Sequence, residues 1–281
     1  MPRSALALFL PWDFSPTVLL TIALAFTLYT VGATRTQPPA PLPRRIAFYA
    51  GLFLLYCALQ TSWDYYASHM FFVHRLQHLI LHDVGPALLA ASAPAAALSS
   101  GLPRWLRQRV TRAIARLHPV ARVIFDPWTA TALYVASLII WIWPPWHFDV
   151  MLSNRLYRLM NWSVVLGDLP FWWLILDPRP YPLARVKGGY RLLMLFVVML
   201  PMMLAGAILG LTRQDLYPVY NVCGRFAPIS ALTDQHLGGL IIWIPGSIFL
   251  AIIALVVFRR ILHQEHAART AATPQVESAG L

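Results

Sequence analysis

Residues 237–258 have the sequence LGGLIIWIPGSIFLAIIALVVF, which contains no charged side chain. A helix needs about 20 apolar residues to cross a bilayer, because in hydrocarbon its backbone groups must satisfy one another. The whole chain of 281 residues has the same character, with 58% hydrophobic and 12% charged residues. Soluble domains carry about 25% charged residues. The composition therefore excludes a soluble protein and predicts an all-α, polytopic membrane bundle.

Charge-poor windows predict seven transmembrane helices. We expect the spans at residues 14–34, 46–63, 66–98, 127–148, 158–176, 192–212 and 237–258. The third window has no polar loop to divide it, so we expect one long helix, bent near Pro86 or Pro94, where the backbone N–H is missing. Residues 1–262 then form a single transmembrane helical domain, and residues 263–281 form a flexible cytoplasmic tail.

The basic residues give the orientation. Most of them lie in the first, third and fifth loops and in the C-terminal tail. Because basic residues that flank spans stay on the cytoplasmic side, we expect the N-terminus outside and the C-terminus inside. In the third loop, residues 102–120, arginines alternate with Leu, Val and Ile. This pattern fits a short amphipathic helix on an anionic bilayer surface, or arginines that only fix orientation. Arginines spread over several loops do not indicate a nucleic-acid partner.

Four histidines lie within fourteen residues of the third span. His74, His78 and His82 recur at intervals of four, so a helix places them in one stripe. His69 lies about 140° around the helix from His74. Ionisable side chains inside a membrane are costly and usually functional, and neutral imidazole binds copper, zinc or haem iron. The stripe is therefore a candidate metal site, with hydrogen bonding between helices as the alternative.

Other polar residues lie near the same expected outer side. They are His147, and the run Asp234, Gln235 and His236 just before the last span. Two imidazoles suffice to bind linear Cu(I). His236 is the expected additional ligand from another helix, beside His74 and His78. The alternative for Asp234 and Gln235 is a helix N-cap followed by close packing at two glycines, residues 238–239.

The remaining unusual residues have simpler interpretations. Asp168 lies in the middle of the fifth span, where it bonds to a neighbouring helix or belongs to a proton or ion pathway. The methionines of the sixth span are expected to fill gaps in the packing. No nucleotide-binding loop, nucleophile motif or zinc-protease motif is present, so we do not expect an enzyme. A b-type cytochrome and a copper or solute transporter remain alternatives.

Three stretches resemble the CtaG family of bacterial cytochrome c oxidase assembly factors. They are HRLQHLIL at 74–81, which PALL follows at 86–89; Gly167 with FWW at 171–173; and DQHLGGLIIW at 234–243. The chain departs from the family pattern at Arg75, where Met is common, and at Tyr157 and Asn161, which replace a histidine pair.

The resemblance implies a role in maturing a copper-containing oxidase of the bacterial plasma membrane. It implies copper handling at the outer face, with the oxidase subunits and a copper chaperone as partners. We expect His74, His78 and His236 as ligands, with His69 and His82 as further candidates and Asp234, Gln235, Asp168 and His147 as other functional residues.

Overall fold

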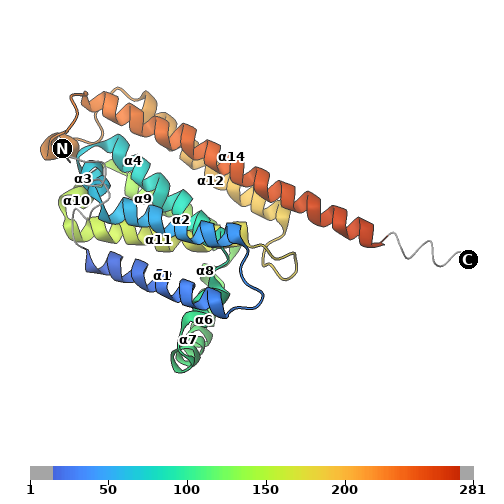
Figure 1. The fold of residues 1–281 in the computed structure, drawn as a ribbon. Coiled ribbons are helices and arrows are strands. Elements are labelled where there is room, and N and C mark those ends of the chain that lie inside the picture. The colour runs from blue at the N-terminus through green and yellow to red at the C-terminus, as the bar shows by residue number, and fades with distance from the viewer. Residues whose placement is uncertain (1–14, 273–281) are drawn as a thin grey trace, which may run out of the picture.

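The computed structural model describes residues 15–272, and the side chains of residues 15–267. Within that range the structure is helical and contains no strand (Figure 1). The helices in chain order are α1 (Pro16–Arg35), α2 (Leu42–Gln60), α3 (Ser62–His69), α4 (Phe71–Leu79), the π-helical turn η2 (Ile80–Val84), α5 (Gly85–Ala91), α6 (Ala95–Gly101), α7 (Arg104–Arg116), α8 (His118–Ile124), α9 (Pro127–Ile142), α10 (Pro144–Leu152), α11 (Asn154–Leu176), α12 (Gly188–Leu211), α13 (Val219–Cys223) and α14 (Ala231–Ala272).

Five helices are long and apolar enough to cross a membrane by themselves, namely α1, α2, α11, α12 and α14. Two bent pairs qualify if each is counted as one span. The segment Phe71–Ala91 meets α6 at 75°, and α8 meets α9 at 66°. The candidate spans therefore number five to seven, and seven matches the prediction from composition.

The third predicted span is not one helix. Met70 is extended, with φ −139° and ψ 125°, and separates α3 from α4. A second break follows α5, where Ala93 has φ +48° and precedes Pro94. The bend expected near Pro94 is confirmed. Pro86 lies in the first turn of α5, directly after the π-helical turn η2, and the His82 carbonyl four residues before it accepts from the Trp172 indole instead of a helical N–H.

Two other predicted ranges differ from the helices of the structure. The fourth span was expected to reach residue 148, but α9 ends at Ile142 and α10 begins at Pro144, because the two prolines at 144–145 cannot donate to the preceding turn. The last helix begins at Ala231 and continues to Ala272. The first ten residues of the expected tail, 263–272, are therefore helical, and residues 273–281 lie outside the described part of the chain.

Helices α12 and α14 pack closely along their length. A Cβ atom on Gly239 would lie 2.4 Å from the backbone nitrogen of Gly210, so only glycine permits this approach. On the preceding residue, a Cβ on Gly238 would lie 2.4 Å from the Phe71 ring. The close packing predicted for these two glycines is confirmed, and it places α14 against both α12 and α4.

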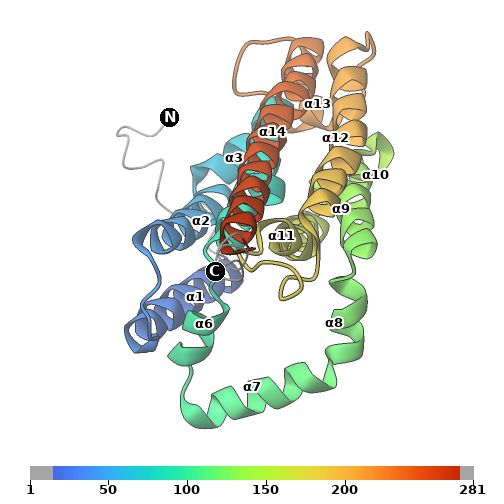
Figure 2. The same ribbon diagram turned by 90° about the vertical axis from the view of Figure 1, so that its right-hand side faces the viewer.

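Helix α4 and the turn η2, which carry the histidine stripe, are enclosed by other helices of the bundle. In Figure 2 α14 and α12 lie beside α9 and α10 in the upper part of the bundle, and α7 crosses below it. The turn η2, which continues α4, also packs against α2 and α11. This arrangement buries one face of α4 and η2 among protein side chains.

Candidate functional site

The three histidines predicted as a stripe do lie on one face of α4 and η2. The ring centroids of His74 and His78 are 4.5 Å apart, and those of His78 and His82 are 5.4 Å apart. All three residues are buried, with exposed fractions of 0%, 3% and 4%. His82 remains on this face although it lies in the π-helical turn η2.

Two of these imidazoles have no hydrogen-bond partner in the structure. Both ring nitrogens of His74 and both of His78 are buried and unpaired. A buried polar group without a partner costs about 1–3 kcal/mol, so such groups call for an explanation. Two adjacent imidazoles with unused nitrogens are suited to sharing a soft metal ion.

A third imidazole comes from a different helix. The ring centroid of His147, on α10, lies 5.1 Å from that of His74. The Nδ1 atom of His147 bonds to the Trp141 carbonyl at 3.0 Å, and its Nε2 atom bonds to the Tyr220 hydroxyl at 3.1 Å. Since a carbonyl only accepts, we assign the proton to Nδ1 and the hydroxyl as donor to Nε2. His147 is thereby held in a fixed orientation beside the pair.

At the other end of the stripe, His82 is oriented by a carboxylate. Its Nδ1 atom lies 2.5 Å from Oδ2 of the fully buried Asp168 on α11. The indole of Trp172 donates to the His82 carbonyl at 2.6 Å. A carboxylate on one ring nitrogen leaves the other nitrogen as a potential metal ligand, the usual arrangement around metal-bound histidines. The bond predicted between Asp168 and a neighbouring helix is confirmed.

A small cavity lies next to the stripe. It has a volume of about 30 Å³, and its lining includes His78, His82 and the thioether of Met202. Asp83 also lines it and accepts from the Tyr134 hydroxyl at 2.6 Å. The space admits about one water molecule, so this cavity suits an ion rather than an organic ligand.

Arg75 places a positive charge at this cavity. It is 3% exposed, and its Nε and Nη2 atoms have no hydrogen-bond partner. Its guanidinium carbon lies 5.1 Å from the centre of the Phe71 ring, and it lines the same cavity as His78 and His82. No salt bridge joins Arg75 to an acid within the described residues.

Several residues around the cluster were not predicted as a group. Tyr157 donates to Asp64 at 2.7 Å and to Gln77 at 3.2 Å, and its ring lies 6.1 Å from that of His74. Gln77 in turn donates to the Ala58 carbonyl at 2.7 Å. The sequence signals were the position of Gln77 between two stripe histidines and the departure from the family pattern at Tyr157. The partners come from distant segments that spacing cannot connect.

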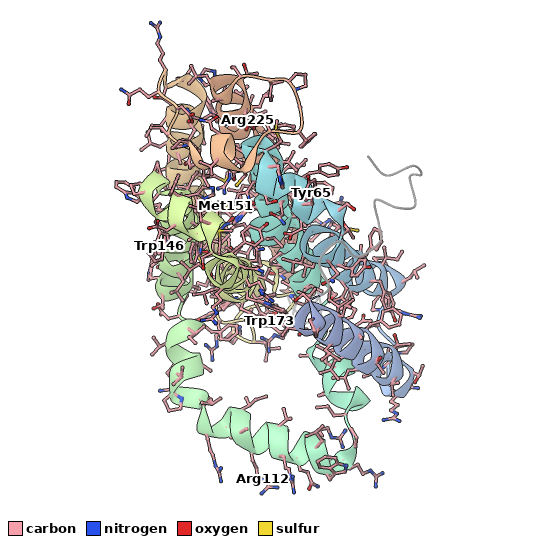
Figure 3. The ribbon with its side chains drawn as sticks, turned by 90° about the vertical axis from the view of Figure 1, so that its left-hand side faces the viewer. Tyr65, Arg112, Trp146, Met151, Trp173 and Arg225 are labelled. Carbon is pink, nitrogen blue, oxygen red and sulfur yellow. The ribbon has the colours of Figure 1, made fainter. Side chains whose placement is uncertain are left out.

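Asp234 caps the N-terminus of α4 rather than that of its own helix, α14. Its carboxylate accepts from the backbone N–H groups of Phe71 at 3.0 Å and Phe72 at 2.9 Å, the first residues of α4. Arg225 donates to the same carboxylate at 2.9 Å, from the loop end of the bundle labelled in Figure 3. The N-cap interpretation for α14 is therefore wrong, because α14 starts at Ala231 and Asp234 faces α4 across the interface that Gly238 opens.

The two residues after Asp234 serve the loop that follows α12. Gln235 accepts from the Leu216 N–H at 2.7 Å and donates to the Gln214 carbonyl at 2.9 Å. His236 bonds through Nε2 to the Thr212 carbonyl at 2.8 Å. The structure therefore does not bring His236 to His74 and His78, and the imidazole found beside His74 is that of His147.

His69 also lies apart from the stripe. The break at Met70 leaves it on α3, where Nδ1 bonds to the Tyr65 carbonyl at 2.8 Å and the ring contacts that of Tyr65. Within the described residues, no three His, Cys, Asp or Glu side chains are grouped so that they could hold a metal ion. The remaining ligand candidates are the adjacent, buried imidazoles of His74 and His78, and the arrangement resembles a two-coordinate site more than a closed cage.

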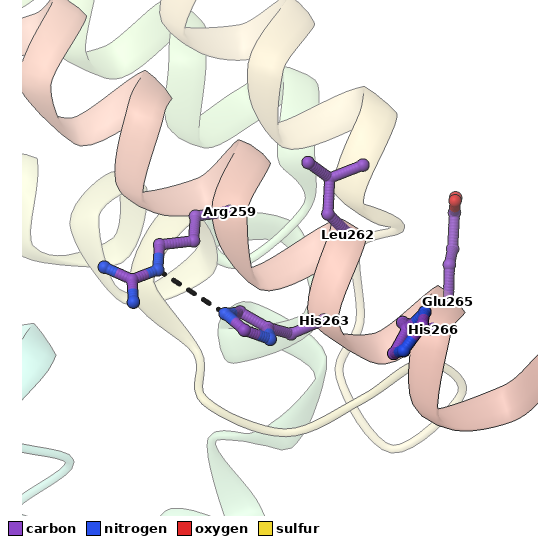
Figure 4. Close-up of a pocket in the computed structure, with 5 residues that line it drawn as sticks. All are labelled: Arg259, Leu262, His263, Glu265 and His266. Carbon is purple, nitrogen blue, oxygen red and sulfur yellow. Dashed lines mark hydrogen bonds between the residues drawn. The ribbon is translucent and has the colours of Figure 1, made fainter. Parts of the chain in front are cut away.

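A larger hollow of about 490 Å³ lies on the C-terminal part of α14, far along the chain from the stripe (Figure 4). Arg259, Leu262, His263, Glu265 and His266 line it, and Arg259 bonds to His263 at 3.4 Å. All five residues come from one helix and are exposed or half-buried. One helix face cannot enclose a ligand, so the histidine cluster remains the candidate site.

Comparison with known proteins gives one family. The family model described as cytochrome c oxidase caa3 assembly factor (Caa3_CtaG) matches residues 25–264. An uncharacterized protein of Mycobacterium leprae (strain TN) is 24% identical over 94% of this chain and 41% of its own length. An uncharacterized protein of Mycobacterium bovis is 27% identical over 80% of this chain and 35% of its own length. The chain thus spans less than half the length of these relatives. No solved structure matches the chain.

Proposed function

The chain belongs to the cytochrome c oxidase caa3 assembly factor family, and we propose that it supports assembly of a copper-containing oxidase by binding copper at His74 and His78. The observation that carries the proposal is the pair of buried imidazoles whose four ring nitrogens have no partner. The proposed role is non-catalytic, since the cluster offers ligands for an ion but no nucleophile with an activating base.

The geometry favours a low coordination number. The His74 and His78 rings are adjacent, with centroids 4.5 Å apart, and His147 stands beside them with both nitrogens engaged. Two neighbouring imidazoles suffice for two-coordinate Cu(I), whereas zinc requires a tetrahedral set of four. His82, oriented by Asp168, and the Met202 thioether at the cavity provide further ligands for an ion that moves along the stripe.

The positive charge of Arg75 at the cavity also favours Cu(I) over Cu(II). Arg75 is buried and carries a positive charge that no acid neutralises within the described residues. Repulsion between buried like charges grows in proportion to the charge of the ion. Arg75 therefore disfavours Cu(II) about twice as strongly as Cu(I), which makes the site selective for the monovalent ion.

The proposed setting is the bacterial plasma membrane. Family membership supports the oxidase as the partner, and a copper chaperone would supply the ion. The distribution of basic residues supports an outward position of α3 and of the residues that precede α14. Copper would then enter from the outer face, close to Arg225 and Asp234, and reach His74 first.

A deletion strain tests this function. Loss of the gene should lower cytochrome c oxidase activity in membranes most strongly when copper is limiting, and the wild-type chain should restore it. A His74→Ala/His78→Ala chain should not restore it, whereas His118→Ala, an exposed histidine at the start of α8, should. Normal oxidase activity in the deletion strain at limiting copper would contradict the assembly role, and full rescue by the double variant would contradict the assigned ligands.

A further inference from the structure

Helix α7 stands apart from the bundle. It runs from Arg104 to Arg116 and none of its residues is buried. Its main described neighbour is the short helix α8. In Figure 1, α7 is seen nearly end-on below α1, while α1, α12 and α14 run across the view. The axis of α7 is therefore roughly perpendicular to the long helices, as expected of a helix that lies in the plane of a membrane surface.

The two faces of α7 have opposite chemistry. Leu106, Val110 and Ile114 recur every four residues and form an apolar strip that continues to Leu117, and Val110, Ile114 and Leu117 have exposed fractions of 36%, 61% and 59%. The helix also carries five arginines and no acid, at positions 104, 107, 109, 112 and 116. Arg112 lies two residues from both Val110 and Ile114, about 200° around the helix.

The orientation of these faces matches a membrane interface. In Figure 3 the side chain of Arg112 points away from the bundle. The apolar strip, on the opposite side of α7, therefore faces the bundle side, where the hydrocarbon around the spans lies. Lipid-facing apolar side chains with arginines directed toward the headgroups are the pattern of an interfacial helix.

We propose that α7 lies on the membrane that the bundle crosses and binds anionic lipid headgroups through its arginines. The charge of the helix selects the ligand, because five arginines without an acid bind a negatively charged surface. The strip from Leu106 to Leu117 anchors the helix in the acyl region, as burial of apolar area favours. The helix thereby ties α6 to α8 and limits the movement of the segments that carry the bends after α5 and before α9.

The test measures the depth of the two faces in the full chain. Val110→Cys and Gln108→Cys are two residues apart on opposite faces, and each is spin-labelled in a chain with Cys57→Ala and Cys223→Ser. In nanodiscs that contain phosphatidylglycerol, the label at position 110 should be accessible to oxygen and protected from a water-soluble nickel chelate. The label at position 108 should show the reverse.

A variant of α7 with fewer arginines tests whether anionic headgroups hold the helix at the membrane surface. Each basic residue near an anionic surface changes its association by about fivefold. Arg109→Gln, Arg112→Gln and Arg116→Gln together should therefore shift the equilibrium of α7 away from the surface by on the order of a hundredfold. Nickel access at position 110 should rise accordingly. Discs of phosphatidylcholine alone should give the same rise with the unaltered arginines.

Two results would overturn the proposal. Equal nickel access at positions 108 and 110 in anionic discs would mean that α7 stands in water. Protection of position 110 that is unchanged by the arginine variant and by neutral lipid would mean that the strip packs against protein.

Discussion

The unpaired imidazoles of His74 and His78 lie near the positive charge of Arg75. Replacing Arg75 tests how this charge affects copper binding. Arg75→Gln removes the charge and adds no thioether that could bind Cu(I). Cu(II) should then bind more tightly relative to Cu(I), by on the order of tenfold or more at an effective dielectric of about 20. Anaerobic titration of the purified chain with each ion, against a competing chelator, measures the ratio.

Arg155→Gln, which removes an exposed arginine, is the control and should leave the ratio unchanged. A ratio that Arg75→Gln does not alter would contradict the selective role of Arg75.

At the scale of single residues, part of the site could be predicted from the sequence. The spacing of His74, His78 and His82 placed them on one face, because helical periodicity is a local property. The choice between His147 and His236 as the neighbouring imidazole depended on loop geometry. His236 bonds to the Thr212 carbonyl, whereas His147 is held beside His74 by its bonds to Trp141 and to Tyr220 of α13.

At the scale of elements, the histidine helix depends on a cap supplied by another helix. Asp234→Ala leaves the Phe71 and Phe72 N–H groups and Arg225 without their acceptor. Loss of a cap costs about 1–2 kcal/mol, so the free energy of unfolding should fall by about that amount. Thermal unfolding in detergent, followed by circular dichroism, measures the change. Asp234→Asn keeps an acceptor and should cost less.

Asp149→Ala, which removes an exposed acid from α10, is the matched control and should change the stability by less than about 0.5 kcal/mol. Equal stability of the Asp234→Ala and Asp149→Ala chains would contradict the capping role.

Hydropathy predicted the existence of the spans but not their interruptions. The third span is broken at Met70, a residue with no sequence signal for a break. The carboxylate of Asp234 accepts from the N–H groups at the start of α4, which have no partner within the helix. This acceptor comes from a residue more than 160 positions away. The break at Pro94 was predicted, because proline lacks the N–H that the helix requires. The break at Pro144 was not predicted, although it has the same cause.

At the scale of the whole molecule, the function depends on which side of the membrane the cluster opens to. The basic loops predict that the N-terminus lies outside and the C-terminus inside. Reporter fusions after Arg122 and Lys187 should therefore indicate the cytoplasm, and a fusion after Val222 should indicate the outside. An outside signal after Arg122 would contradict this orientation and the outer entry of copper.

The most direct test of the central claim is copper binding by the purified full chain. Under anaerobic conditions, the wild-type chain should retain stoichiometric Cu(I) against a competing chelator, with nitrogen ligands in X-ray absorption. The His74→Ala/His78→Ala chain should lose this ion while remaining folded in the detergent, and His118→Ala should bind as the wild type does. Wild-type Cu(I) stoichiometry in the double variant would contradict the assignment of His74 and His78 as ligands.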